Sequence, residues 1–392
     1  MRTQVGIVGA GPAGLLLSHL LHLEGVDSIV LETQSRAYVE ARIRAGVLEH
    51  GAARTLADAG VGERLHQEGL VHRGINLNFS GQTHRIDLSE LTGGRAVTVY
   101  GQHEVVKDLI EARLAAGGDL RFSTSDLQID GIEADTPSLT FMQDGQRQEI
   151  ACEFVAGCDG FHGVSRGYIP SSQQQVYQRS YPFAWLGILA AARPASEELV
   201  YARHPNGFAL LSMRSAEITR AYLQCAPDED LAQWSDDRIW QELHRRLEVE
   251  RGLRLNEGPI LQRGVTPMRS FVIEPMQYRR LFLAGDAAHI VPPTGAKGMN
   301  LAIADVRVLS RALASYFRSG GAGLLDAYSA TCLKRVWQVQ RFSWWMTALL
   351  HRFPEADTFG ERLRDAELGN VIGSRPASQS LAENYVGLPY DP

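Results

Sequence analysis

The chain opens with apolar and polar stretches whose order predicts a strand, a helix and a second strand. An apolar run at 5–8 is followed by glycines, then by a leucine-rich segment that begins at Leu15, and a second apolar run covers 28–31. Strands buried on both faces read as continuous apolar runs, whereas helices repeat apolar positions every three to four residues. Residues 1–35 are therefore predicted to form a βαβ unit.

Further along the chain the pattern predicts short strands interrupted by helices. We expect a hairpin, then a three-stranded meander, then four strands that form an antiparallel sheet. The predicted strands lie at 74–79, 84–88, 127–132, 138–143, 148–154, 185–190, 198–203, 208–214, 219–224 and 280–286. The predicted helices lie at 47–60, 103–116, 236–248, 297–319 and 325–350, and the segment before Ser378 is expected to be a surface loop.

This order predicts a mixed α/β fold with three units. Residues 1–180 would form a Rossmann-like nucleotide-binding domain, and 270–300 would return to its sheet. Residues 181–269 would form an antiparallel β-sheet domain for the substrate. Residues 297–392 would form a helical region, whose tryptophans are expected in the core or at the contact of a homodimer.

Composition and charge narrow the functional classes. The 392 residues carry 39 Lys and Arg against 45 Asp and Glu, a net charge of −6 that argues against nucleic-acid or membrane-surface partners. No apolar stretch has the length of a transmembrane helix, and glycines break the N-terminal one, unlike a signal peptide. The four cysteines lack metal-binding spacing, so we expect reduced thiols, no metal and a cytoplasmic location.

The glycines between the first strand and helix carry the first chemical signal. Gly9, Gly11 and Gly14 form a G-x-G-x-x-G pattern. In that pattern the first glycine permits a tight turn, the second admits a pyrophosphate, and the third lets the helix pack closely on the strand. Glu32 ends the second strand, where a carboxylate can bind ribose hydroxyls. A glycine-rich turn without a ligand would not require Glu32, so a dinucleotide site is favoured.

A second signal comes far later in the chain. Asp286 follows Gly285 at the end of a predicted strand, and a long helix is expected after Gly295. A carboxylate there can accept a hydrogen bond from a ribose or ribityl hydroxyl, and the helix N-terminus favours the negative charge of a reduced flavin. Taken alone, Asp286 is equally well explained as a helix N-cap.

A third signal lies on the predicted antiparallel sheet. The two-residue period of a strand places Ser212 with Arg214 on one face, and Arg220 with Tyr222 on one face of the next strand. Tyr201 lies on a neighbouring strand. A hydroxyl, a guanidinium and a phenol on one face can bind a carboxylate. A solvated sheet face with ordinary polar residues is the alternative.

Three separated blocks resemble the group A FAD-dependent aromatic hydroxylases. They are the glycine pattern with Glu32, the segment Cys158-Asp159-Gly160, and Gly285-Asp286-Ala287-Ala288-His289 with Pro292-Pro293. The likeness runs essentially from end to end toward members that act on 4-hydroxybenzoate, and includes 42–49 and 383–390. It implies tightly bound, non-covalent FAD, with NADH and/or NADPH and O2 as co-substrates. The implied reaction is C3 hydroxylation of 4-hydroxybenzoate to 3,4-dihydroxybenzoate through a flavin C4a-hydroperoxide, in the degradation of aromatic compounds.

The resemblance also implies individual roles in the substrate pocket. The carboxylate would be held by three residues: Ser212, Arg214 and Tyr222. The phenol would be contacted by Tyr201, which is bonded to Tyr385, near the carbonyl of Pro293. A surface histidine, His72, would pass the phenolic proton to solvent.

For the cofactors the resemblance implies two sets of residues. The FAD set is Gly9, Gly11, Pro12, Ala13, Gly14, Glu32, Arg42, Arg44, Val47, Gln102, Asp159, Arg220, Gly285, Asp286, Gly298, Met299 and Asn300. The nicotinamide set is Gln34, Tyr38, Arg44, His162, Arg166 and Arg269.

The chain departs from NADPH-specific relatives in the segment after Glu32. Thr33 stands where those relatives carry an arginine, and Glu40 adds a negative charge near the expected 2′ position. A 2′-phosphate is repelled by a carboxylate, so NADH should be used at least as well as NADPH, unless Arg36 substitutes. Met213 and Met299 replace residues typical of the relatives, which leaves another hydroxylated benzoate open as substrate. A non-enzymatic dinucleotide-binding sensor is the more distant alternative.

Overall fold

The predicted βαβ unit begins the fold as β1 (Val5–Val8), α1 (Pro12–Leu23) and β2 (Ser28–Leu31). The computed structural model describes residues 1–42, 46–249 and 252–390. All four residues of both strands are buried, as their apolar runs require, and Pro12 occupies the first turn of α1, where its missing N–H costs nothing.

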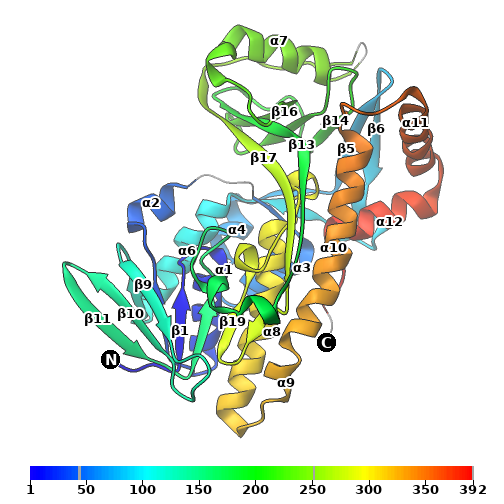
Figure 1. Cartoon of the computed structure of the whole chain (residues 1–392). Coiled ribbons are helices and arrows are strands. Elements are labelled where there is room, and N and C mark those ends of the chain that lie inside the picture. The colour runs from blue at the N-terminus through cyan, green and yellow to red at the C-terminus, as the bar shows by residue number, and fades with distance from the viewer. Residues whose placement is uncertain (43–45, 250–251, 391–392) are drawn as a thin grey trace.

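A six-stranded sheet surrounds β1 (Figure 1). Its order is β18 (Gln277–Tyr278), β19 (Leu281–Leu283), β12 (Phe154–Gly157), β1, β2 and β8 (Asp119–Arg121). Every pair is parallel except β18 with β19. The late strand β19 therefore rejoins the first sheet, but only 277–283 of the predicted 270–300 does so, because 270–274 and 289–290 pair into a different sheet. Helix α1 packs against α6 (Gln102–Ala115) and α8 (Gly298–Ser319).

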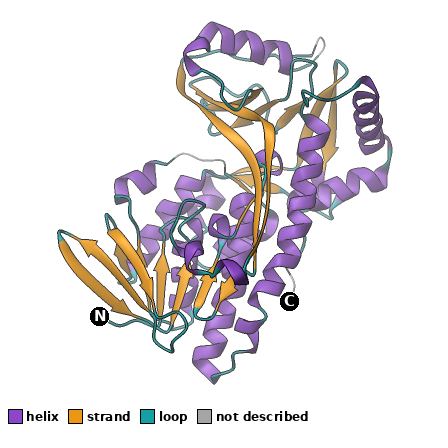
Figure 2. Cartoon of the chain, in the orientation of Figure 1, coloured by secondary structure: helices purple, strands orange, loops and turns teal. Residues whose placement is uncertain are grey.

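An eight-stranded sheet forms the second layer (Figure 2). Its order is β20 (His289–Ile290), β17 (Ile260–Glu274), β13 (Gln175–Ala190), β16 (Thr219–Cys225), β15 (Ala209–Met213), β14 (Val200–Ala202), β5 (Gly74–Phe79) and β6 (Gln82–Asp87). The long strands β13 and β17 run side by side between the two lobes of the molecule, and α7 (Asp236–Leu247) lies over the upper part of the sheet (Figure 1).

Smaller elements complete the described residues. A meander of β9 (Ser125–Asp130), β10 (Ser138–Gln143) and β11 (Gln146–Ala151) is antiparallel as predicted, and β3 (Val47–Leu48), β7 (Val97–Val99) and β4 (Leu70–His72) form another sheet. The remaining α-helices are α2 (Arg36–Ala41), α3 (His50–Asp58), α4 (Glu63–Glu68), α5 (Leu88–Leu91), α9 (Gly323–Asp326), α10 (Tyr328–Leu350), α11 (Thr358–Gly373) and α12 (Arg375–Val386).

Several predicted elements need correction. The segment before Ser378 is not a surface loop but α11 and the start of α12. The helix expected at 47–60 begins as strand β3, and the one expected at 325–350 divides into α9 and α10. Strand β17 was not predicted. The four-stranded sheet is larger than expected and contains one parallel pair, β14 with β5.

The predicted unit boundaries can be compared with sheet membership. Strands β5 and β6 fall within 1–180 but pair into the eight-stranded sheet. Strand β13 crosses the predicted boundary at residue 180. In the part of the chain that the structure covers, no helix is long and apolar enough to cross a membrane.

Candidate active site

The turn between β1 and α1 has the shape that a pyrophosphate requires. Gly9 has a φ of 103°, and a Cβ on Gly14 would lie 2.0 Å from the carbonyl oxygen of Gly9. A Cβ on Gly11 would meet nothing within 4 Å, so open space lies before the first turn of α1. Open space beside unpaired helix N–H groups is a fitting place for a phosphate group.

Glu32 is fixed at the edge of this turn. Its Oε2 accepts the N–H of Ala10 at 2.8 Å, and its Oε1 accepts the N–H of Gln34 at 2.8 Å. Ionised carboxylate oxygens each accept more than one hydrogen bond. Glu32 can therefore receive ribose hydroxyls in a set orientation.

The turn at Gly285 and Asp286 lies against the same helix start. Gly285 has a φ of 65°, and a Cβ there would come within 3.6 Å of Ala13 and 3.1 Å of Ala302. Its N–H donates to Asp305 Oδ2 at 2.9 Å. The two turns, far apart in the sequence, thus form one crevice at the carboxyl ends of parallel strands, where α/β proteins bind nucleotides.

A third loop, the one that contains Asp159, closes on this crevice. A Cβ on Gly9 would lie 2.5 Å from the carbonyl oxygen of Cys158. Asp159 Oδ2 accepts the N–H of Ser165 at 2.9 Å, whereas Oδ1 is buried with no hydrogen-bond partner among the described residues. Burial raises the pKa of Asp159. A ligand hydroxyl or amide at Oδ1 would satisfy the orphaned oxygen.

Phe161 organises the predicted nicotinamide residues, and sequence reasoning missed it. Arg166 and Arg269 lie over its ring at 4.8 and 4.7 Å, and the ring of His162 meets it edge-on at 5.1 Å. Arg166 also donates to the carbonyls of Phe161 at 2.7 Å and Ala287 at 3.0 Å. His162, Arg166 and Arg269 are therefore brought together. The only available signal was that Phe161 follows the Asp-Gly pair directly.

The other predicted nicotinamide residues lie on or beside α2. Tyr38 is 50% exposed on this helix, and Gln34 precedes it. Arg42 is its exposed C-cap, whereas Arg44 lies outside the described residues. Gln102, a predicted flavin contact, is the first residue of α6.

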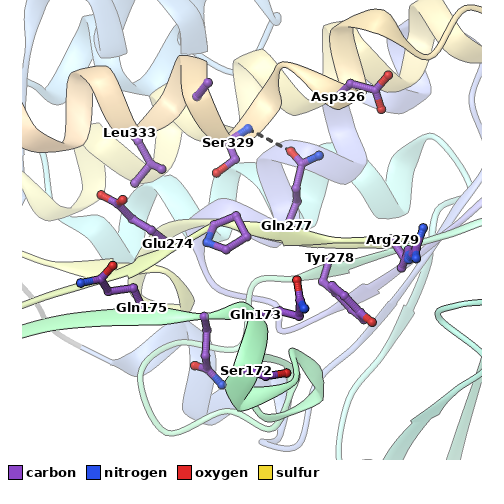
Figure 3. A pocket seen from close by; sticks show the side chains of 13 residues that line it. Ser172, Gln173, Gln175, Glu274, Gln277, Tyr278, Arg279, Asp326, Ser329 and Leu333 are labelled. Atoms are coloured by element: carbon purple, nitrogen blue, oxygen red, sulfur yellow. Dashed lines mark hydrogen bonds between the residues drawn. The ribbon is translucent and has the colours of Figure 1, made fainter.

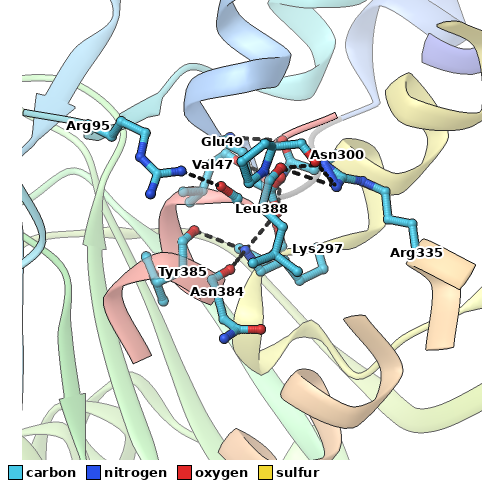
Figure 4. A network of polar contacts seen from close by, with 12 residues as sticks. Val47, Glu49, Arg95, Lys297, Asn300, Arg335, Asn384, Tyr385 and Leu388 are labelled. Carbon is cyan, nitrogen blue, oxygen red and sulfur yellow. Dashed lines mark hydrogen bonds and ion pairs between the residues drawn. The ribbon is translucent and has the colours of Figure 1, made fainter. Parts of the chain in front are cut away.

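The first turn of α8 is tied to β3 by Asn300. Its Nδ2 donates to Val47 O at 2.9 Å, and its Oδ1 accepts the N–H of Glu49 at 2.9 Å (Figure 4). The adjacent Lys297, 1% exposed, donates to Glu49 Oε1 at 2.7 Å. These bonds fix the backbone of Gly298 and Met299 beside Val47. The buried Lys297–Glu49 pair was not predicted, because no local pattern joins residues so far apart.

The predicted substrate residues that lie on strands, Tyr201, Ser212 and Tyr222, share one face of the eight-stranded sheet. Tyr201 pairs with Leu210, which pairs with Tyr222, so these residues form one row across three strands. Ser212 and Arg220 form the next row. The strand-period argument is confirmed, because the alternate residues of these strands pack into a different apolar cluster beneath α7.

Two guanidinium groups gather at one end of this face. Arg214 Nη1 donates to Ser212 Oγ at 3.1 Å, but its Nε has no partner in the described parts of the chain. The same holds for Nε and Nη1 of Arg220, whose Cζ lies 5.1 Å from the ring centroid of Tyr222. Burial lowers the pKa of Arg214, the nearby Arg220 lowers it further, and Tyr222 opposes both. Burying a cation without a counter-ion costs free energy. An anionic ligand bound at this site would offset that cost.

A buried pair of phenols forms another part of the site. Tyr201 and Tyr385 are each 1% exposed, and their hydroxyl oxygens are 2.6 Å apart. Burial raises the pKa of both tyrosines. The Pro293 carbonyl, in the loop before α8, accepts the N–H of Ala296 at 2.9 Å. A proton can pass along a hydrogen bond as short as that of the phenol pair without either tyrosine leaving its place.

The expectation that His72 lies at the surface was wrong. The side chain is 1% exposed, and neither ring nitrogen has a hydrogen-bond partner within the described residues. Burial lowers its pKa to about 4, with smaller and opposite effects from Glu198 and Arg214. The polar sequence around His72 suggested exposure, but pairing of β4 with β7 at Val97 covers it. The positive charge of Arg214 lies close enough to lower the pKa of the His72 ring.

A cavity elsewhere in the molecule does not contain these residues. It has a volume of about 820 Å³ and opens widely to solvent near Gln173, Gln277, Tyr278 and Ser329 (Figure 3). None of the predicted site residues lines it. The crevice and the sheet face described above are therefore the candidate active site.

Comparisons with known proteins agree with this assignment. The FAD binding domain family matches residues 2–343. A p-hydroxybenzoate hydroxylase of Acinetobacter baylyi is 48% identical over 391 residues, covering 100% of this chain and 96% of the relative. A 3-(3-hydroxy-phenyl)propionate/3-hydroxycinnamic acid hydroxylase of a Mycobacterium species is 28% identical over 83% of this chain and 56% of its own. The crystal structure of p-nitrophenol 4-monooxygenase from Pseudomonas putida superimposes with a TM-score of 0.84 at 18% identity, covering 99% of both chains.

Proposed function

The chain belongs to the group A FAD-dependent aromatic hydroxylases, and from this premise we propose that it converts 4-hydroxybenzoate to 3,4-dihydroxybenzoate with NAD(P)H and O2. As a flavoprotein monooxygenase it acts on aromatic substrates. The choice of 4-hydroxybenzoate is supported by the name of the relative that is 48% identical over the full chain.

A single observation carries the proposal. One face of the eight-stranded sheet brings the unpartnered guanidinium nitrogens of Arg214 and Arg220 together with the buried phenol pair of Tyr201 and Tyr385. A substrate with a carboxylate at one end and a phenol at the other satisfies both needs. Arg214 binds the carboxylate with Ser212, and Tyr201 receives the phenol.

FAD fits the crevice because the residues there include a suitable binding group for each part of the cofactor. The open space at Gly11 would hold the pyrophosphate, Glu32 would bind the ribose, and Asp286 with the first turn of α8 would hold the flavin end. When bound, FAD supplies the redox chemistry that accepts hydride and activates O2. The protein positions the cofactor and the substrate and shields both from water.

The residues of the pocket prepare the substrate ring for attack. A phenol in water has a pKa of about 10, and the ring carbon beside the oxygen is far more nucleophilic once the proton is lost. Tyr201 holds the substrate hydroxyl, and Tyr385 accepts the proton relayed through Tyr201. His72 has unpartnered ring nitrogens and remains the proposed next carrier, but its pKa of about 4 means that at pH 7 it can hold the proton only transiently, and groups outside the described contacts must bridge it to Tyr385.

The test is the reaction itself. Purified protein with bound FAD, NADH or NADPH, O2 and 4-hydroxybenzoate should yield 3,4-dihydroxybenzoate, identified by chromatography and mass spectrometry. Benzoate, which lacks the phenol, should yield no hydroxylated product. Faster turnover and product formation with another hydroxylated benzoate would replace the proposed substrate. A colourless protein, or a yellow one inert to the whole panel, would favour the dinucleotide-binding sensor.

A homodimer and a cytoplasmic location remain parts of this proposal. The dimer is supported by Trp337 and Trp344, which are 41% and 45% exposed on α10, with Tyr177 packed edge-on against Trp337 at 5.2 Å. Exposed aromatic clusters of this kind mark subunit contacts. Light scattering should give about twice the chain mass of 43.2 kDa.

A further inference from the structure

The position of Tyr385 depends on how the end of α12 is held. Tyr385 is the penultimate residue of this helix, and the chain continues as the irregular segment 387–390. The last carbonyls of a helix have no partner inside it. Gly387 then turns the chain with a φ of 95°, and a Cβ there would lie 2.3 Å from Glu49 Oε2. Groups that bind the carbonyls at the end of α12 therefore fix the position of the Tyr385 phenol.

Lys297 binds the helix end itself. Its buried Nζ donates to Asn384 O at 2.6 Å and to Tyr385 O at 2.9 Å, in addition to its ion pair with Glu49 (Figure 4). A cation at the C-terminal end of a helix is favoured by the helix dipole. Because Lys297 is the N-cap residue of α8, the phenol is tied directly to the predicted flavin-binding turn.

Two arginines bind the segment beyond the helix. Arg335 of α10 donates from Nη2 to Leu388 O at 2.7 Å, and Arg95 donates to Gly387 O at 3.1 Å (Figure 4). Hydrogen bonds from a charged donor are roughly twice as strong as neutral ones. The segment is therefore held by its backbone, whatever side chains it carries at these positions.

Tyr390 forms the outer anchor. Arg335 and Arg307 both lie over its ring, with Cζ atoms 4.5 and 4.3 Å from the centroid. A Cβ on Gly51 would lie 2.7 Å from the ring, so α3 closes on it as well. The Tyr390 hydroxyl is buried and has no hydrogen-bond partner among the described residues. The aromatic ring, not the hydroxyl, is thus the binding group.

We propose that residues 387–390, held by Arg335 and Tyr390, act as a clasp that positions Tyr385 during hydroxylation. The inference rests on the proposed function, because it assigns a purpose to the Tyr201–Tyr385 bond in that reaction. Arg335 and Tyr390 are positioning residues, since they touch the segment and not the substrate face. A displacement of about 1 Å at a reacting group can lower a rate about 100-fold. A loosened clasp therefore leaves flavin reduction intact and slows proton removal from the substrate.

The experiment compares four variants of the FAD-loaded protein. Arg335→Met removes the bonds to Leu388, and Tyr390→Leu removes the ring. Tyr390→Phe keeps the ring. Arg375→Met, the matched control, removes an exposed ion pair with Glu90 at the opposite end of α12. The readouts are 3,4-dihydroxybenzoate formed per NAD(P)H oxidised, hydrogen peroxide released, flavin reduction rate, and hydrogen exchange of the amides at 378–390.

Arg335→Met and Tyr390→Leu should lower the product yield about twofold or more, with faster exchange at 378–390 and an unchanged reduction rate. Tyr390→Phe and Arg375→Met should match the parent. Equal product per NAD(P)H oxidised in all variants overturns the inference. A variant that loses FAD or stability, but keeps the parent's product yield per bound FAD, overturns it as well. If the parent itself makes no 3,4-dihydroxybenzoate, the proposed function fails, and the exchange data alone decide whether the clasp exists.

Discussion

At the scale of single residues, the bond between Tyr201 and Tyr385 gives the sharpest prediction. Its length of 2.6 Å and the burial of both rings leave little freedom for another donor to take the place of the missing hydroxyl. Tyr385→Phe should therefore permit flavin reduction but slow hydroxylation about tenfold or more. Hydrogen peroxide should rise in proportion. Product per NAD(P)H oxidised, measured beside peroxide, checks this.

A matched control exists in the same apolar cluster. Tyr181 is buried there too, but its hydroxyl has only a long contact of 3.3 Å with Ser270. Tyr181→Phe should leave the ratio of product to NAD(P)H unchanged. If Tyr385→Phe and Tyr181→Phe form equal amounts of product per NAD(P)H oxidised, Tyr385 has no role in proton transfer.

Single-residue predictions succeeded where a short-range rule applied. Ser212 and Tyr222 share a face because a strand repeats every two residues and the connecting turn is short. His72 failed because its burial depends on a strand paired from further along the chain. Phe161 was missed because its role as a platform for two arginines depends on Arg269, which is remote in sequence.

At the scale of elements, α2 determines the expected preference between nicotinamide cofactors. Arg36 Nε donates to Glu40 Oε1 at 2.6 Å along this helix. The only cation within α2 is therefore paired with a carboxylate, which a 2′-phosphate would have to displace. NADH should be used at least as well as NADPH. Steady-state kcat/KM with each cofactor measures this, and strong preference for NADPH would reject it.

Releasing Arg36 should shift that preference. Glu40→Gln removes the paired charge, and exposed ion pairs of this kind are worth about 0.3–0.5 kcal/mol. The ratio of kcat/KM for NADPH over NADH should rise about twofold. Glu24→Gln, which breaks an exposed pair with Arg318 far from α2, should leave the ratio unchanged.

Whole elements were predicted well only where the local pattern was unbroken. The β1–α1–β2 unit has buried apolar runs punctuated by the required glycines. Strands β13 and β17 were shortened or missed because Pro182 and Pro267 interrupt them, and proline removes a donor from the ladder. The structure accommodates Pro182 in a register shift between Ser180 and Ala184, and Pro267 pairs with Ala184 at the edge of that shift. Helix α11 was missed because few of its residues are buried, so it lacks a clear apolar stripe.

At the scale of the whole molecule, the substrate pocket depends on contact between α10 and the eight-stranded sheet. His351, at the end of α10, is stacked between the rings of Phe183 and Phe208 at 4.7 and 4.3 Å. Its Nε2 accepts the indole N–H of Trp185 at 2.7 Å, so its Nδ1 carries the proton and donates to Thr347 O at 3.0 Å. Trp185 in turn contacts Tyr222 of the pocket at 4.9 Å. The neutral imidazole thus joins the helical region to the substrate face.

This arrangement makes stability depend on acid pH. Burial lowers the pKa of His351 to about 3, against 6.5 for the free side chain. Because the folded pKa is the lower one, the unfolded chain binds the additional proton below pH 6.5, and the free energy of unfolding falls as pH decreases toward 3. Between pH 7 and 5 the loss that His351 alone contributes should be about 2 kcal/mol. His351→Gln has no proton to gain, so its free energy of unfolding should fall less steeply over the same interval. Urea unfolding followed by circular dichroism at several pH values gives both slopes. His72 titrates equally in the parent and in His351→Gln, so its contribution cancels when the two slopes are compared. Equal slopes of unfolding free energy against pH would show that His351 does not link folding to pH.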